Sequence, residues 1–257
     1  MEKLRLGGMA LANGVLVHGP TSWGAAVRTE QGEVRAASGT KRRLAAGVQT
    51  PLVRGPLRLA EALAVLPDVR RGLPEARFAF ERPAVLGSLL LATTVSGAVR
   101  RAPLPAVTRE AAVALASLAP ALLALRGGEL AAYHGAEHVS IGAYESDGPA
   151  AREHERCGSH LIGPLLATGA VAGALAQRSP RRLRPLARAL GAVGALGASV
   201  EIFAWMTRHP TRRLARALAR PGYELQHRLA TAEPSPQQLE VARAALDACL
   251  AAEARAA

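Results

Sequence analysis

Four long apolar runs, none of which contains Lys or Arg, dominate the middle of the chain. They cover residues 84–99, 111–125, 161–176 and 189–206. Each has 15 to 18 residues, slightly fewer than the roughly 20 that a spanning helix needs. Buried helices of a soluble bundle have similar lengths. Gly-x-x-x-small spacing, as from Gly191 to Ala195, favours close packing between membrane helices. We therefore predict a membrane-embedded helical core over residues 84–206.

The flanking segments have other patterns. Residues 1–48 read as short strands separated by turns, with "EQGE" as a hairpin. Residues 49–83 are amphipathic, with prolines near a helix start, and predict a helical connector. Residues 207–257 predict a C-terminal helical tail whose last helix carries a Ser-x-x-Gln capping box and packs on the bundle or on a partner subunit. The predicted fold class is mainly α: a membrane-associated helical bundle with a small β-containing N-terminal segment.

The charge is strongly positive, with a net of +12 carried almost entirely by arginine. The basic residues form short clusters beside the apolar runs, and aromatic residues make up only 3%. This pattern favours membrane lipid over nucleic acid as a partner, and we expect a multi-pass protein of the cell membrane with no signal peptide. Five arginines in residues 177–188 and more after 206 bracket the last run. The positive-inside count alone therefore leaves the topology open.

The segment "YHGAEHVSIGAYE", residues 133–145, carries the candidate chemistry. On a helix, His134, His138 and Glu145 fall on one stripe, and Glu137 lies beside His134. Imidazoles and carboxylates at this spacing suit a divalent metal, most simply zinc. The string H-x-x-E-H is also the inverzincin form of the zinc-hydrolase motif, in which the glutamate is the base. The alternative is a pair of surface histidines on an amphipathic helix.

A second cluster follows in "AREHERCGSH", where His154 and Cys157 are three residues apart. We expect three firm ligands, because four protein ligands would close the site and make it structural. Glu137, Glu145 and Cys157 compete for the remaining roles, and Cys157 could instead be a buried small side chain. Glu201, inside the last apolar run, is expected to reach the metal or its surroundings, unless it pairs with Arg208.

Several segments together resemble the YqhQ-like family of bacterial membrane proteins, which are predicted metal-dependent enzymes of unknown function. The resemblance rests on "GGMALANGVLVHGP", "PLVRGPLRLAEAL", "SVEIFAW" and "PGYELQHRLATAEPSPQQLEVARAAL", as well as on the His/Glu/Cys segment. The family's characteristic residues fall on His134, Glu137, His138, Glu145, His154, Arg156, Cys157, Gly158 and Glu201. Asn13, His18, Glu155 and His160 depart from the family pattern, so the N-terminal motif, which could line the same site, is eroded.

The leading functional hypothesis is a metal-dependent membrane hydrolase that acts on an anionic or lipid-derived substrate. Glu137 would be the base, and Arg156 would hold the substrate, with Tyr133 and Glu201 nearby. There are two alternatives. The protein could be a membrane scaffold with a structural metal, or it could conduct metal or other ions past Glu201. Substrate, metal identity and homo-oligomer formation stay open.

Overall fold

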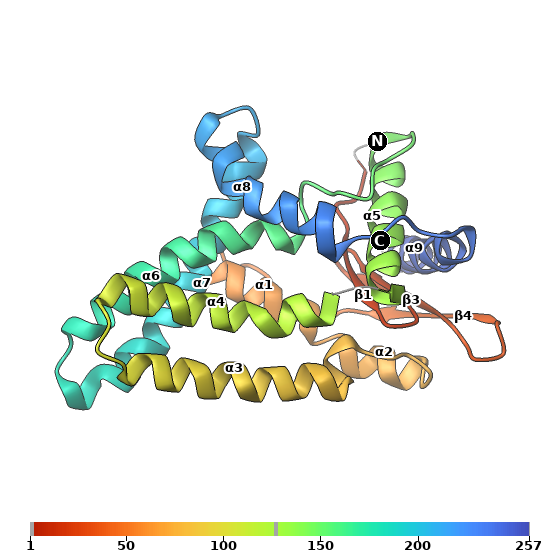
Figure 1. Cartoon of the computed structure of the whole chain (residues 1–257). Helices are drawn as coiled ribbons and strands as arrows, with labels where there is room; N and C mark the ends of the chain where they lie inside the picture. The colour runs from red at the N-terminus through yellow and green to blue at the C-terminus, as the bar shows by residue number, and fades with distance from the viewer. Residues whose placement is uncertain (1–2, 126–127, 257) are drawn as a thin grey trace.

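The computed structural model describes residues 3–125 and 128–256. A small sheet with helices on both faces forms one end of the molecule, and long apolar helices extend from it (Figure 1). This arrangement confirms the predicted fold class, which is mainly helical with a small N-terminal sheet.

The sheet is an antiparallel meander in the order β1-β2-β3-β4. Its strands are β1 Gly7–Leu11, β2 Gly14–His18, β3 Ser22–Arg28 and β4 Val34–Thr40. The predicted hairpin at "EQGE" is confirmed: it joins β3 to β4, and Gly32 has a φ of 86° there. This left-handed conformation suits glycine because it has no Cβ.

Helices cover both faces of the sheet. On one face lie α5 (Gly128–Ser146) and α9 (Pro236–Ala256), and their apolar side chains meet those of β2 and β3. On the other lie α2 (Leu66–Gly72) and the chain that follows it. The C-terminal helix therefore does not pack as a tail on the apolar bundle; it completes the core of the sheet unit, in which Cys249 is fully buried.

The start of α9 has the predicted capping box. The backbone N–H of Ser235 donates to Gln238 Oε1 at 2.8 Å, and the Gln238 N–H donates to Ser235 Oγ at 3.3 Å. These bonds satisfy N–H groups that a helix start leaves without partners. They fix where α9 begins its path across the sheet.

The remaining elements form the connector, the long helices and the segments between them. They are α1 Arg54–Leu63, η1 Ala79–Glu81, α3 Pro83–Arg101, α4 Ala106–Leu125, η2 Gly158–Leu161, α6 Ile162–Arg178, η3 Arg181–Leu183, α7 Arg184–Arg208, α8 Arg213–Leu225 and η4 Gln226–Ala230. All four predicted apolar runs are helical. They pair as two antiparallel hairpins, α3 with α4 and α6 with α7, and α4 packs against α6.

Four helical segments are long and apolar enough to cross a membrane: Pro83–Arg101, Thr108–Leu125, Gly158–Arg178 and Arg181–Arg208. Only 11 to 22% of each apolar window is buried inside the molecule. Large aliphatic side chains such as Leu90, Leu115 and Leu190 are exposed on them. Exposed apolar surface of this extent is costly in water, and hydrocarbon would remove the cost.

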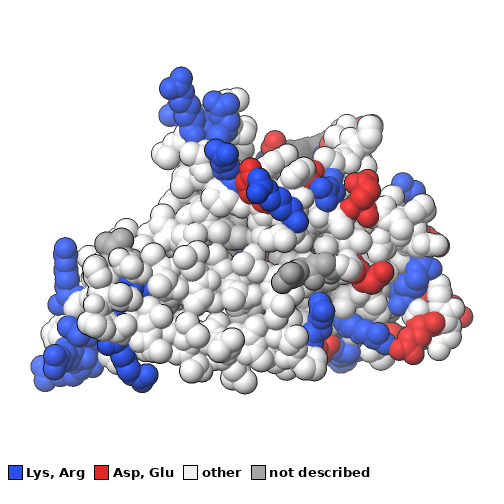
Figure 2. Space-filling model, in the orientation of Figure 1, with Lys and Arg blue, Asp and Glu red and all other residues white. Residues whose placement is uncertain are grey.

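Both hairpin turns lie at the same end of the molecule, opposite the sheet (Figure 1). The arginines of residues 178–188 are at or near this end, whereas those after Arg208 are at the other end of α7. In the view of Figure 2, Lys and Arg gather at the hairpin end without visible Asp or Glu. The two arginine groups that conflict in the positive-inside count thus lie at opposite ends of α7.

The contact between β3 and α9 gives a stability prediction. A Cβ at Gly24 would overlap the backbone of Ala245 and Cys249 in α9. We expect Gly24→Ala to lower the free energy of unfolding by roughly 1–3 kcal/mol through overpacking, measured by thermal melting in detergent. Gly87→Ala in α3 is the matched control, because its Cβ would meet no atom within 4 Å. Equal melting temperatures for the two variants would contradict the close packing of α9 on β3.

Candidate metal centre

His134, His138 and Cys157 converge beside α5. The imidazole centroids of His134 and His138 are 4.3 Å apart, and Cys157 Sγ lies 3.5 Å from His134 Nε2. One potential ligand atom from each residue lies within 4.8 Å of the others. Within residues 3–125 and 128–256, this is the group of donors compact enough to hold a metal ion.

Backbone carbonyls fix the tautomer of both histidines. Nδ1 of His134 lies 2.8 Å from the Ala230 carbonyl, and Nδ1 of His138 lies 2.6 Å from the Arg152 carbonyl. A carbonyl oxygen can only accept, so each Nδ1 must carry the proton and donate it. In the neutral form of each ring, the lone pair is therefore on Nε2. This hydrogen bonding orients metal-binding imidazoles in many proteins, and the donor set of two imidazoles and a thiol suits zinc.

The titration of these groups follows from burial. Burial, helped by the neighbouring His134, lowers the pKa of His138 from 6.5 to about 3, so its ring is neutral at pH 7. Burial also raises the pKa of the Cys157 thiol. A divalent cation among the donors would favour the thiolate, because the ion's charge opposes the cost of burial. Three protein ligands would leave one tetrahedral position open.

Glu137 is buried beside the same donors. Its Oε2 lies 3.9 Å from His134 Nε2, and burial raises the pKa of this carboxyl to about 8, although His134 opposes the shift. A Cβ at Gly8 of β1 would overlap the carboxylate. The Gly-Gly segment at the N-terminus therefore lines the site through the space that Gly8 leaves open.

A loop brings Cys157 to the helix. His154 and Cys157 do not share a helical turn; they lie in the segment between α5 and η2. Gln226, fully buried at the start of the π-helical turn η4, holds this segment. Its Oε1 accepts from the His154 N–H at 2.8 Å, and its Nε2 donates to Ser159 Oγ at 2.8 Å. Isolated π-helical turns often occur at functional sites, and this one also supplies the Ala230 carbonyl.

Glu145 and His154 lie beside the cluster and bind each other. Glu145 Oε2 is 3.3 Å from His154 Nε2, and Glu145 Oε1 accepts from Arg156. His154 Nδ1 accepts from the Arg156 N–H at 3.3 Å. Both ring nitrogens of His154 are thus engaged, and His154 is not part of the compact group of donors. The His154 ring is still close to His138, with 5.5 Å between centroids.

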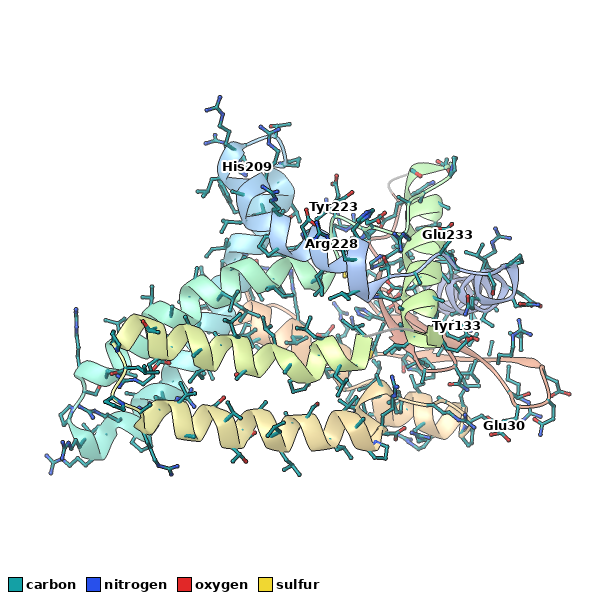
Figure 3. All side chains as sticks on the ribbon, in the orientation of Figure 1. Glu30, Tyr133, His209, Tyr223, Arg228 and Glu233 are labelled. Carbon is teal, nitrogen blue, oxygen red and sulfur yellow. The ribbon has the colours of Figure 1, made fainter. Side chains whose placement is uncertain are left out.

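Two other predicted residues lie elsewhere. Tyr133 (Figure 3) is buried in the core formed with α9. Burial raises the pKa of its hydroxyl, although the charge of Arg28 opposes the shift. Glu201 of α7 binds the guanidinium of Arg54 in α1, whose Nε donates at 2.7 Å. Its carboxylate is therefore paired, as a charge in an apolar helix needs to be, but with a connector residue and not with the metal donors or with Arg208.

Sequence reasoning missed Gln226 and the carbonyls of Arg152 and Ala230. Gln226 lies in "PGYELQHRLATAEPSPQQLEVARAAL", one of the segments on which the family resemblance rests, and this was the available signal. Backbone carbonyls carry no side-chain signature, so no pattern could have found the other two.

Comparison with known proteins places the cluster inside a family domain. Residues 129–252 match a family described as "Protein of unknown function (DUF1385)". The chain matches no curated protein and no solved structure. The DUF1385 domain runs from α5 to α9, and it contains His134, His138, Cys157 and Gln226. The sheet and the first apolar hairpin precede it.

The loop architecture gives a prediction about cysteine reactivity. We expect Gln226→Leu to leave the His154 N–H and the Ser159 hydroxyl without their partner, which costs roughly 1–3 kcal/mol, and to loosen the loop. Cys157 should then react several-fold faster with a maleimide. The rate of labelling is measured by mass spectrometry of the intact chain. Cys249, fully buried in the sheet core, is the internal reference. Exposed Gln237→Leu is the control; an equal rate for Cys157 in both variants would argue against this role of Gln226.

Proposed function

We propose that this protein is a multi-pass membrane enzyme that uses a divalent metal, most simply zinc, and catalyses a hydrolysis. The observation that carries the proposal is the convergence of one ligand atom each from His134, His138 and Cys157, with both Nδ1 atoms bound to carbonyls. A purely structural pair of surface histidines would not need buried rings with fixed tautomers. The DUF1385 match is compatible with this proposal and carries no activity of its own.

Each residue has a role in the proposed reaction. Zinc, when bound, supplies a Lewis acid that activates water near neutral pH. The charge of the bound cation would favour the ionised form of Glu137, whose Oε2 lies 3.9 Å from His134 Nε2. The carboxylate would then accept the proton at Oε2 and return it to the leaving group. The buried position of Glu137 excludes bulk water from this transfer. Arg156 stays partly exposed while it binds Glu145, and it is the nearest of the predicted groups to hold an anionic substrate.

The position of the donors favours an amphipathic substrate. Cys157 directly precedes Gly158–Arg178, one of the segments apolar enough to span a membrane. The cluster therefore lies where a membrane-spanning helix would leave the bilayer. A lipid-derived molecule could present its polar group there while its apolar part stays in the hydrocarbon.

Metal content tests the donor set. We expect the full chain, purified in detergent and dialysed against zinc, to hold about one ion per chain by mass spectrometry of the metal. His134→Ala, His138→Ala and Cys157→Ser should each lower this content at least tenfold. His227→Ala, which removes an exposed imidazole paired with Glu153, is the control. Unchanged metal content in all three cluster variants would remove the proposal.

Glu137→Gln separates binding from chemistry. We expect this variant to keep its metal, while hydrolysis of a panel of acyl esters and phosphate esters falls by 10²-fold or more, because the amide cannot accept the proton. Rates per bound metal are the measurement. If Glu137→Gln and the unchanged chain hydrolyse every active ester equally fast, Glu137 is not the base.

A structural clamp is the second candidate. Cys157 lies between α5 and the start of α6, so a metal there would tie the sheet unit to an apolar helix. This function predicts that chelation lowers the melting temperature and that no ester in the panel is hydrolysed. The three-donor set favours the enzyme, since structural zinc sites usually have four protein ligands.

A further inference from the structure

A groove between α6 and α7 has no role in the proposed reaction. Its volume is about 590 Å³, and its walls are apolar except for two hydroxyl side chains. Ala167, Val171 and Leu175 of α6 face Gly191, Gly194 and Ala198 of α7 across it. The hydroxyl of Thr168 is already bonded to the Pro164 carbonyl at 2.9 Å. The groove therefore suits a hydrocarbon chain and offers little to a polar ligand.

One end of the groove opens at the arginine-rich hairpin turn. Arg184 lies one turn before Ala187 and two turns before Gly191, on the same stripe of α7 that lines the groove. Its Nε donates to the carbonyl of Ser179, which also lines the groove, at 3.1 Å. This contact holds the guanidinium at the mouth.

The turn is positive, and the carboxylate of Glu110 in α4, which lies beside α6, accepts from Gln177 Nε2 at 3.0 Å and not from the arginines of the turn. Residues 158–200 contain no Asp or Glu, and Arg181 and Arg182 beside Arg184 are exposed. Among the side chains of residues 3–125 and 128–256, none forms an ion pair with these three arginines. Figure 2 shows Lys and Arg gathered at this end of the molecule. Basic groups at the end of an apolar helix attract anionic headgroups.

We propose that this groove binds an anionic phospholipid, with an acyl chain between α6 and α7 and the phosphate at Arg181, Arg182 and Arg184. The apolar walls match the chain, and the unneutralised arginines at the mouth match the headgroup. Both helices are segments long and apolar enough to span a membrane, so the groove would face hydrocarbon that already contains this ligand.

Native mass spectrometry of the full chain in nonionic detergent tests the proposal with two lipids, dioleoyl phosphatidylglycerol and dioleoyl phosphatidylcholine. The experiment is run with a chelator present, so that its outcome is independent of the metal centre. We expect phosphatidylglycerol to bind at least roughly tenfold more tightly than phosphatidylcholine, since each arginine near an anionic headgroup raises the affinity roughly fivefold. Replacing Arg181, Arg182 and Arg184 by Gln should remove this preference, and replacing them by Lys should retain most of it.

Gly194→Leu tests the groove itself. A Cβ at Gly194 meets no atom within 4 Å, so the new side chain can enter the groove without disturbing the helices. We expect binding of both lipids to fall at least roughly fivefold. Gly169→Leu in α6 is the control, because Gly169 is equally open and does not line the groove.

Matched charge removal gives the second control. Arg212, Arg213 and Arg216, at or near the start of α8, are exposed, and their replacement by Gln should leave the lipid preference intact. Equal affinity of the unchanged chain for the two lipids would overturn the proposal. An equal loss of lipid preference in the α8 variant, or unchanged lipid binding by Gly194→Leu, would also overturn it. If neither lipid binds and the chain forms a dimer that Gly194→Leu dissociates, the groove is an interface between two copies of the chain and the proposal is wrong.

Discussion

Two hydrogen bonds to backbone carbonyls decide what the histidines of α5 can do. The Ala230 and Arg152 carbonyls each accept from an imidazole Nδ1, so the neutral form of each ring has its free lone pair on Nε2. The carbonyls come from segments on either side of the second apolar hairpin in the sequence. The site therefore depends on the fold of the segment from α5 to η4, and its geometry depends on the π-helical turn and on the Gln226 side chain.

The candidate centre belongs to the sheet unit, and this position has a physical advantage. α5 is packed against β1 and α9, so the imidazoles stand on a helix that two other elements hold in place. A site on rigid elements keeps its donors close to the geometry that a metal requires. The apolar helices, with few buried residues, depend on their surroundings for their packing and would hold such donors less firmly.

The sequence predicted the helices well because apolar runs and turn residues act locally. The four runs, the "EQGE" hairpin and the capping box of Ser235 and Gln238 all depend on neighbours within a few residues. It also brought out His134, Glu137, His138 and Cys157, since chemistry-bearing residue types are rare in this chain. How α9 lies on β3 could not be predicted, because the overlap that Gly24 avoids is with residues more than two hundred positions away.

The same limit applies to the ligand roles. The helical stripe grouped Glu145 with the histidines. For Glu201, the sequence suggested the metal site or Arg208 as the neighbour. The structure pairs Glu145 with Arg156 and Glu201 with Arg54. A carboxylate in a chain rich in arginine has many potential partners, and tertiary packing chooses among them. Spacing therefore identified which residues carry charge or lone pairs, but only the fold could show which charges are already neutralised.

The difference between paired and unpaired arginines shows where the net charge of +12 lies in the structure. Near the sheet, arginines such as Arg28, Arg35, Arg54 and Arg77 bind carboxylates. At the turn between α6 and α7, the segment from 158 to 200 contains no carboxylate. Lys and Arg therefore gather at the hairpin end, opposite the sheet, and a second group lies over α8 (Figure 2). The lipid site proposed at the hairpin end and the metal site proposed beside α5 thus use different charged groups, so that neither proposal draws on the residues of the other.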